Sequence, residues 1–184
     1  MNLANQLTIF RIVVIPLLVF FFYWPVSWAG YAVVSLFIVA ALSDWFDGYI
    51  ARRLQQTTGF GAFLDPVADK LIVAVVLILL TEEVGSWPLT VAALVIIGRE
   101  ITVSGLREWM SSLGKEKLVR VTFVAKIKTV VQMTAIVFLL LAQKTTLSLP
   151  GIDLFVVGLF LLYLAVVLTL VSMLIYVFLI AKSS

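Results

Sequence analysis

The sequence predicts an all-α integral membrane protein, a bundle of six transmembrane helices, and three observations support this prediction. Of the 184 residues, 63% are hydrophobic and only 12% are charged, about half the charged fraction of an ordinary soluble domain. The apolar residues are gathered in stretches close to the roughly 20 residues that a helix needs to cross a bilayer. Short connections between the stretches favour antiparallel neighbours. We therefore expect residues 1–184 to form one membrane domain.

The first three predicted spans occupy the N-terminal half of the chain. The first runs from Leu7–Trp24 and stops at Pro25, because proline does not continue a helix. The second is Trp28–Arg53 and the third is Phe60–Leu80. Pro66 falls near the start of the third span, where a missing amide is tolerated or introduces a local kink.

The last three predicted spans follow in the C-terminal half. They are Pro88–Met110, Val119–Leu141 and Ile152–Ile180. Gly85 before the fourth span, and Pro150-Gly151 before the sixth, are typical turn residues. Each of these spans is again long enough to cross the hydrocarbon layer.

The distribution of charge predicts the orientation in the membrane. Basic residues gather in one set of connections and at the C-terminus, namely Arg52, Arg53, Lys115, Lys117, Arg120 and Lys182. The opposite connections hold Lys144 together with the acids Glu82, Glu83 and Asp153. The positive-inside rule then places both termini and the connections 52–60 and 111–118 on the cytoplasmic side of the membrane. Trp24, Trp28 and Trp87 would lie at the outer interface as an aromatic belt.

Composition also excludes several kinds of chemistry. The formal net charge is only +3 and the basic residues are clustered, so we expect no nucleic-acid partner. The chain contains no cysteine, which excludes disulfide bonds and cysteine metal sites. It also contains no histidine, which removes the usual general base and the commonest zinc ligand.

Four aspartates form the most informative cluster in this apolar sequence. Asp44 and Asp47 are three residues apart and Asp65 and Asp69 are four apart, so each pair lies on one helix face. The turn between the second and third spans brings the two pairs together. Converging carboxylates repel one another strongly at low dielectric. A hard divalent cation with oxygen ligands, such as Mg²⁺ or Mn²⁺, would relieve this repulsion, so the aspartates are predicted metal ligands.

The residues between the aspartates suit a phosphate-containing ligand. Gly48 removes a side chain directly after Asp47, where a ligand could approach closely. Arg52 could hold a phosphate through two parallel hydrogen bonds. Gly61 lies one helical turn before Asp65 and again leaves room.

This spacing resembles the signature of a known family. The pattern Asp44-x-x-Asp47-Gly48-x-x-Ala51-Arg52, eight residues, then Gly61-x-x-x-Asp65-x-x-x-Asp69 matches the CDP-alcohol phosphotransferase family at every fixed position. The likeness to one branch of that family also covers Asn5–Arg11, Pro16, Gly98–Glu100, Ser104–Trp109, Lys126–Thr129 and Gln132. One departure is Ala125, where the branch commonly has glycine. Members of the family are six-helix membrane enzymes that form homodimers. The resemblance therefore implies six helices and a homodimer here too.

The resemblance implies a two-metal mechanism with CDP-diacylglycerol as the donor. Asp44 and Asp65 would bridge two divalent ions, Mg²⁺ or Mn²⁺, while Asp47 would complete the first ion and Asp69 the second. The ions would neutralise the pyrophosphate and stabilise the leaving CMP. Asp69 would also be the catalytic base that takes the proton of the acceptor alcohol. The residues expected to contact the donor are Gly48, Arg52, Thr58 and Gly61.

The acceptor is inferred from the remaining basic residues, Arg11, Arg99, Arg107, Lys126 and Lys128. Arg99 and Arg107 are eight residues apart and share a helix face, and the neighbouring Glu100 and Glu108 are not expected to face them. Cations in a membrane demand anionic partners. We therefore expect a phosphorylated acceptor, sn-glycerol 3-phosphate, to be bound by these five residues. Snorkelling to lipid headgroups is the alternative for the two lysines, and a structural role is the alternative for Arg11.

Two other readings remain at this point. Within the same chemistry, the acceptor could be inositol phosphate, or phosphatidylglycerol in a cardiolipin-type reaction. From a different class, intramembrane acids could form a cation-transport site. The outer halves of most spans carry no acids or bases that would continue such a path, and transport does not need the spacing of Gly48, Arg52 and Gly61.

Overall fold

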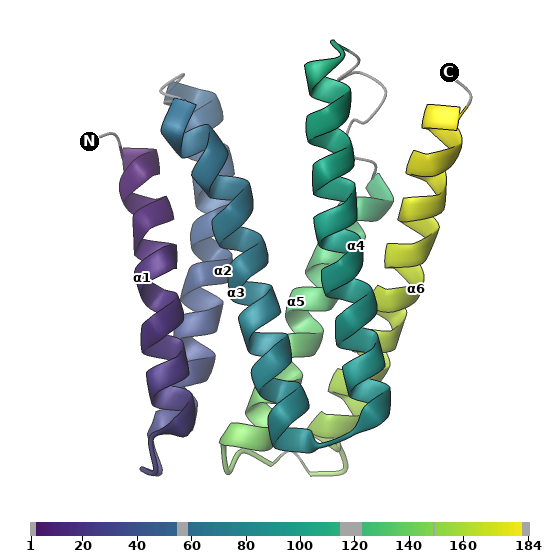
Figure 1. Ribbon diagram of the computed structural model, residues 1–184. Coiled ribbons are helices and arrows are strands. Elements are labelled where there is room, and N and C mark those ends of the chain that lie inside the picture. The colour runs from purple at the N-terminus through teal and green to yellow at the C-terminus, as the bar shows by residue number, and fades with distance from the viewer. Residues whose placement is uncertain (1–2, 55–58, 115–122, 149, 182–184) are drawn as a thin grey trace.

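The computed structural model describes residues 3–54, 59–114, 123–148 and 150–181, which form six helices and contain no strand (Figure 1). The helices are α1 Leu3–Tyr23, α2 Ala29–Leu54, α3 Gly59–Val84, α4 Trp87–Ser112, α5 Phe123–Lys144 and α6 Leu154–Ala181. Each predicted span coincides with one helix, with ends that differ by a few residues. The predicted all-α class is therefore confirmed for the described residues.

Three of these helices contain segments that are long and apolar enough to cross a membrane. The segments are Trp87–Ser112, Ala125–Lys144 and Leu154–Tyr176, and two shorter apolar segments, Ile9–Tyr23 and Ala29–Ser43, lie in α1 and α2. By these features of its described residues the chain is a helical membrane protein. The predicted start of the fifth span, Val119, lies outside the described residues.

The sixth span begins later than predicted because of a cap. Asp153 precedes the first residue of α6, and its Oδ1 accepts hydrogen bonds from the backbone N–H of Phe155 at 2.9 Å and of Val156 at 3.3 Å. Aspartate is among the preferred residues at this position, because its side chain satisfies N–H groups that have no partner within the helix. The helix therefore begins at Leu154 rather than at Ile152.

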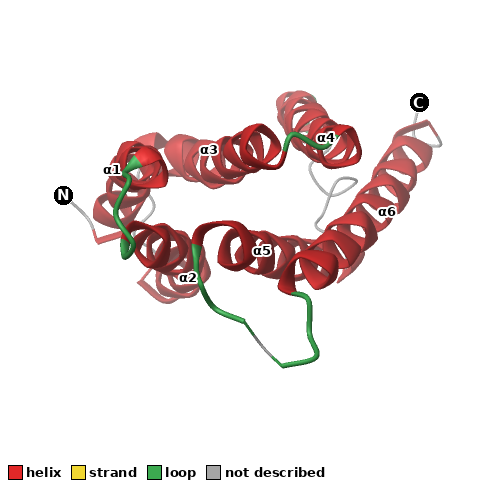
Figure 2. Cartoon of the chain, turned by 90° about the horizontal axis from the view of Figure 1, so that it is seen from below, coloured by secondary structure: helices red, strands yellow, loops and turns green. Residues whose placement is uncertain are grey.

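The helices run up and down through the bundle. The start of α1, the end of α6, and the ends of α2 and α4 all lie at the upper end in Figure 1. Seen from below, the helices form two rows, with α1, α3 and α4 in one and α2, α5 and α6 in the other (Figure 2). Contacts within the rows are made by α1 with α3, α3 with α4, α2 with α5 and α5 with α6, and the rows meet mainly through α1 with α2, α3 with α5 and α4 with α6.

Among the side chains that the structure describes, the main apolar cluster lies in the lower half of the bundle. Every buried member of this cluster belongs to the half of its helix that is nearer the lower end of Figure 1. Its fully buried large side chains are Leu18, Phe37, Leu77, Leu80, Leu89, Ile96, Ile136, Leu139, Leu140 and Leu162. A second cluster, between α4 and α6, comprises Val103, Met110 and Tyr176 among the residues whose side chains are described.

Two glycines allow close helix contacts in this lower half. A Cβ atom on Gly30 would lie 1.6 Å from the carbonyl oxygen of Lys144 at the end of α5, so α2 and α5 approach this closely only because residue 30 has no side chain. A Cβ atom on Gly158 would lie 2.9 Å from Cγ of Leu139 and 3.0 Å from its backbone nitrogen. Small residues serve the same purpose at many helix contacts in membrane proteins.

Polar contacts close the lower end of the bundle. Lys144 forms an ion pair with Glu83 at 2.9 Å, and its Nζ lies 3.8 Å from the ring centroid of Phe22. The hydroxyl of Tyr23 donates a hydrogen bond to Glu82. Lys144, Glu82 and Glu83 were predicted to share one side of the bundle, and they lie at this same end. Trp24, Trp28 and Trp87 are exposed at the same end, as residues of an aromatic belt would be.

Candidate functional site

The four aspartates lie at matching positions on two neighbouring helices. Asp44 is ten residues before the last residue of α2, and Asp69 is ten residues after the first residue of α3. Asp47 is seven residues before that end of α2, and Asp65 is six residues after that start of α3. Because α2 and α3 contact each other and run in opposite directions, this register puts the two pairs at similar heights in the bundle.

For these four aspartates the structure describes the backbone and not the side chains. The surroundings of the residues predicted to contact the donor are likewise not described for Gly48, Arg52 and Gly61, and Thr58 lies outside the described residues altogether. Among the side chains that are described, no three acidic groups come together in a way that could hold a metal ion. The metal and donor sites therefore stay predictions, and the backbone register of α2 and α3 is compatible with them.

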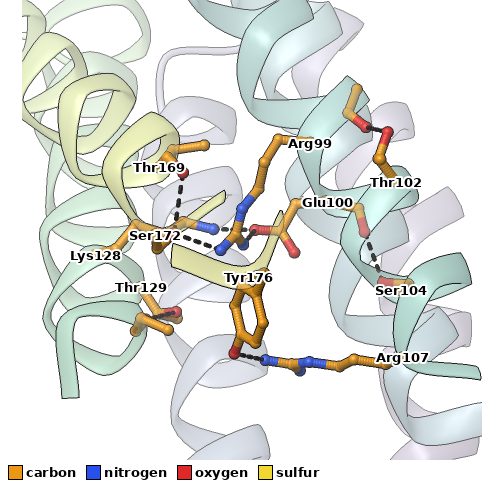
Figure 3. A network of polar contacts seen from close by, with 12 residues as sticks. Arg99, Glu100, Thr102, Ser104, Arg107, Lys128, Thr129, Thr169, Ser172 and Tyr176 are labelled. Atoms are coloured by element: carbon orange, nitrogen blue, oxygen red, sulfur yellow. Dashed lines mark hydrogen bonds and ion pairs between the residues drawn. The ribbon is translucent and has the colours of Figure 1, made fainter. Parts of the chain in front are cut away.

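A buried cluster of cations lies between α4, α5 and α6 (Figure 3). We call it the cation cluster, and it consists of Arg99 and Arg107 of α4 and Lys128 of α5, together with Glu100. Arg99 and Lys128 are only 7% and 2% exposed, respectively, so these are charges removed from solvent. Three of the five basic residues predicted from the sequence thus come together in the structure.

Glu100 is the acid of the cation cluster. Its Oε1 pairs with Nζ of Lys128 and lies 3.5 Å from Nη1 of Arg99. The expectation that Glu100 would not face Arg99 was therefore wrong. Side chains of adjacent helix residues normally diverge, but here both are long enough to turn toward Lys128 on the neighbouring helix.

Helix α6 supplies residues that sequence reasoning missed. Nη2 of Arg99 donates a hydrogen bond to Oγ of Ser172 at 2.5 Å, and Nη2 of Arg107 donates one to the hydroxyl of Tyr176 at 2.6 Å (Figure 3). Ser172 in turn donates to the carbonyl oxygen of Thr169 at 2.9 Å. Positions 169, 172 and 176 follow the spacing i, i+3, i+7 of one helix face, and this polar stripe in an apolar span was the signal that could have found them.

The other two predicted cations lie elsewhere. Lys126 is exposed, on a different side of α5 from the buried Lys128, because two residues correspond to about 200° around a helix. Arg11 is 1% exposed on α1, which packs against the aspartate-bearing helices α2 and α3. The structure therefore does not bring Lys126 into the cation cluster, and it places Arg11 on the side of the bundle where the aspartates are.

Several buried polar atoms of α4, α5 and α6 have no hydrogen-bond partner among the described residues. They are Nε of Arg99, Nε of Arg107, Oε1 of Gln132 and Oγ1 of Thr169. Leaving a buried donor unsatisfied costs about 1–3 kcal/mol. A ligand with several acceptor oxygens would satisfy the two arginine donors, so the cation cluster is suited to bind an anion.

The charge of the cluster indicates which anion fits. Three cations and one carboxylate leave two positive charges in excess. A phosphate monoester carries about −1.5 to −2 near neutral pH and offers three strong acceptor oxygens. Arginine matches these oxygens with two parallel hydrogen bonds. The cluster thus fits a phosphate monoester in both charge and hydrogen-bonding capacity.

A cavity of about 270 Å³ lies next to the cation cluster, between α3 and α4. Its walls are mainly apolar, with Leu71, Ile96 and Ile97 among them, and Glu100 and Lys70 also line it. A phosphate would find few hydrogen-bond donors on such walls. By its described lining the cavity is less suited to an anion than the cation cluster, which lies on the α5 and α6 side of α4.

Comparisons with known proteins all show similarity to the same class of transferases. Residues 1–180 match the CDP-alcohol phosphatidyltransferase family. The chain is 48% identical over 175 residues to "CDP-diacylglycerol--glycerol-3-phosphate 3-phosphatidyltransferase" of Escherichia coli K12, which covers 95% of this chain and 92% of the relative. Proteins of the same name from Shigella sonnei Ss046 and Shigella flexneri serotype 5b match with the same identity and coverage.

Proposed function

Because this chain belongs to the CDP-alcohol phosphatidyltransferase family, we propose that it transfers the phosphatidyl group of CDP-diacylglycerol to sn-glycerol 3-phosphate. The products are phosphatidylglycerophosphate and CMP, a step of phospholipid biosynthesis. Relatives that carry the name of this activity are 48% identical over 95% of the chain, which supports the same reaction here. Family membership also removes the reason to consider cation transport.

The cation cluster is the observation that carries the choice of acceptor. Serine, choline or free inositol would bring no negative charge to Arg99, Arg107 and Lys128. A phosphorylated alcohol supplies the charge that the two excess cations require. It also supplies acceptor oxygens for the Nε atoms that have no partner among the described residues. Glycerol 3-phosphate meets both requirements and is the acceptor in the names of the relatives.

Two divalent ions, Mg²⁺ or Mn²⁺, fit the aspartate set that α2 and α3 bring to similar heights. Carboxylate oxygens are the ligands that such hard cations prefer. Asp44 and Asp65 would be shared by both ions, with Asp47 on one and Asp69 on the other. When bound, such ions would neutralise the negative charge of the pyrophosphate and the charge that develops on the leaving CMP.

The residues of the chain then carry the transfer itself. The acceptor hydroxyl attacks the phosphorus that bears diacylglycerol, the bond from that phosphorus to the CMP oxygen breaks, and CMP leaves. Asp69 takes the proton of the attacking hydroxyl, since a carboxylate is the available base in a chain without histidine. Gly48, Arg52, Thr58 and Gly61 hold the donor. The cation cluster keeps the acceptor oriented through its phosphate.

One assay tests the proposal directly. CMP release from CDP-diacylglycerol is measured with glycerol 3-phosphate, with inositol phosphate, with phosphatidylglycerol and with no acceptor. We expect release to depend on glycerol 3-phosphate, and thin-layer chromatography to identify phosphatidylglycerophosphate as the product. Release that depends on inositol phosphate or phosphatidylglycerol instead would assign a different acceptor and overturn the proposal.

All six helices are proposed to cross the membrane, with both termini and the aspartates on the cytoplasmic side. A single cysteine at Gln56, in this cysteine-free chain, is expected to react with a membrane-impermeant thiol reagent only when the reagent reaches the cytoplasm. A cysteine at Ser148, which is exposed in the α5–α6 connection at the opposite end, is the matched control and should react in intact cells. The reverse labelling pattern would invert the orientation. A homodimer is also proposed from the family likeness, and cross-linking in membranes would test it.

A further inference from the structure

Helix α6 holds the two arginines of the cation cluster at two points. Ser172 accepts a hydrogen bond from Arg99, and Tyr176 accepts one from Arg107 (Figure 3). Both α6 residues are fully buried. We propose that Ser172 and Tyr176 are positioning residues, which fix the directions of Arg99 and Arg107 so that their remaining donors meet the acceptor's phosphate. This inference rests on the proposed function and concerns residues to which the comparisons give no role.

The geometry at Ser172 favours alignment of Arg99 over direct binding of phosphate. A serine hydroxyl has one proton to donate and two lone pairs. The proton of Ser172 is used in the bond to the carbonyl oxygen of Thr169, at 2.9 Å. What Ser172 presents to the cluster is therefore an acceptor, and an acceptor binds a guanidinium and repels a phosphate oxygen. Its role is to hold Arg99.

Tyr176 restrains Arg107 through both its hydroxyl and its ring. The hydroxyl accepts the bond from Nη2, while Cζ of Arg107 lies 5.3 Å from the ring centroid, within the range of a cation–π contact. The ring itself is held in the small apolar cluster with Val103 and Met110. An arginine that moved freely would lose rotamer freedom on binding a ligand. Because Tyr176 restrains Arg107 beforehand, less of that cost falls on the binding step.

Helix geometry sets the spacing of Ser172 and Tyr176, the two residues of α6 that anchor the arginines. Arg99 and Arg107 are eight residues apart on α4, about 12 Å along the axis, whereas Ser172 and Tyr176 are four residues apart on α6, about 6 Å. The anchors on α6 are thus closer together than the backbone positions on α4. In both arginines the bond to α6 uses Nη2, and Nε has no partner among the described residues. Since a guanidinium carries five N–H donors, each arginine keeps its Nε–H and further Nη donors for a shared anion.

Tyr176→Phe tests the inference, because phenylalanine keeps the ring and removes only the hydroxyl. We expect the KM for glycerol 3-phosphate to rise about tenfold, as for the loss of one hydrogen bond to a charged group. The KM for CDP-diacylglycerol and the thermal unfolding midpoint should stay at wild-type values. The matched control is Tyr163→Phe, the same change at an exposed position of α6, which should leave both KM values unchanged.

A double-mutant cycle separates positioning from other roles. If Tyr176 acts through Arg107, then Tyr176→Phe in an Arg107→Ala background should change the acceptor KM less than twofold. Ser172→Ala should likewise raise the KM for glycerol 3-phosphate and not that for CDP-diacylglycerol. The opposing view is that these bonds only hold α4 to α6. A lower unfolding midpoint with both KM values unchanged, or with both raised equally, would support that view and overturn the inference.

The same experiment distinguishes this inference from the proposed function. Wild-type CMP release in the presence of glycerol 3-phosphate is measured first, and its absence would refute the proposed function and the inference together. If wild-type protein uses glycerol 3-phosphate and Tyr176→Phe keeps the wild-type acceptor KM, only the positioning role is refuted. A full tenfold effect that persists without Arg107 would also refute it, because Tyr176 would then act by another route.

Discussion

Asp65→Asn is expected to lower kcat by about 10³-fold or more while the protein still folds. Asp65 is proposed as a ligand shared by both divalent ions, and asparagine offers a neutral oxygen in place of a charged one. Stabilisation by metal ions is worth several kcal/mol in the transition state, and each 1.36 kcal/mol is a factor of ten in rate. The measurement is CMP release at saturating CDP-diacylglycerol and glycerol 3-phosphate, with yield and thermal unfolding recorded in parallel.

The same assay includes a chelator and a matched substitution. Removal of divalent ions from wild-type protein should abolish CMP release, and added Mg²⁺ or Mn²⁺ should restore it. Asp153→Asn is the control, because Asp153 caps α6 at the lower end of the bundle and asparagine caps a helix about equally well. It should keep wild-type activity. An Asp65→Asn protein that turns over at nearly the wild-type rate would refute the two-metal site.

Arg107→Ala is expected to reduce kcat/KM for glycerol 3-phosphate by about 30- to 150-fold, with a much smaller effect on CDP-diacylglycerol. The loss corresponds to about 2–3 kcal/mol, the value of a charged hydrogen bond to a buried phosphate. Arg52→Ala should show the opposite pattern, since Arg52 lies on α2 with the aspartates and is proposed to hold the donor. Steady-state kinetics with each substrate varied in turn measures both effects.

Lys126→Ala provides the comparison for Arg107→Ala. Lys126 was among the cations predicted from the sequence to bind the acceptor, but it is exposed and lies away from Lys128 on α5. Its replacement should therefore change the acceptor kinetics less than twofold, which is the range of an exposed charge. If Arg107→Ala left the KM and kcat/KM for glycerol 3-phosphate unchanged, the argument for a phosphorylated acceptor would lose its main support.

The sequence alone predicted the helices well and their partners poorly. Apolar runs and turn residues located all six helices, because helix formation in an apolar solvent depends on local sequence. The start of α6 was missed by two residues, since Asp153 was read as a loop charge and not as a cap. Which helix contacts which depends on packing between distant segments. The approach of α2 to α5 at Gly30, for example, has no periodic signal in the sequence.

The residues of the candidate site were also predicted in part and missed in part. Arg99, Arg107 and Lys128 could be identified because charges are conspicuous in apolar spans. Ser172 and Tyr176 were missed because neither is charged, and each is unremarkable in a helix until a partner on α4 is known. The pairing of Glu100 with Arg99 was misjudged for a related reason: the deciding residue, Lys128, lies on another helix.

The uneven distribution of the apolar core has a consequence for local unfolding. Among the side chains that the structure describes, the large cluster holds the lower half of the bundle, whereas the apolar cluster between α4 and α6 higher up consists of Val103, Met110 and Tyr176. Segments with few buried apolar contacts open at a lower free energy than the rest of a fold. Among the described residues, the upper parts of α4 and α6 therefore have few buried apolar contacts, and we expect them to open at a lower free energy than the lower parts of the same helices. Because these parts carry Arg107 and Tyr176, which are proposed to serve the acceptor site, we expect substitutions that stabilise them to slow turnover.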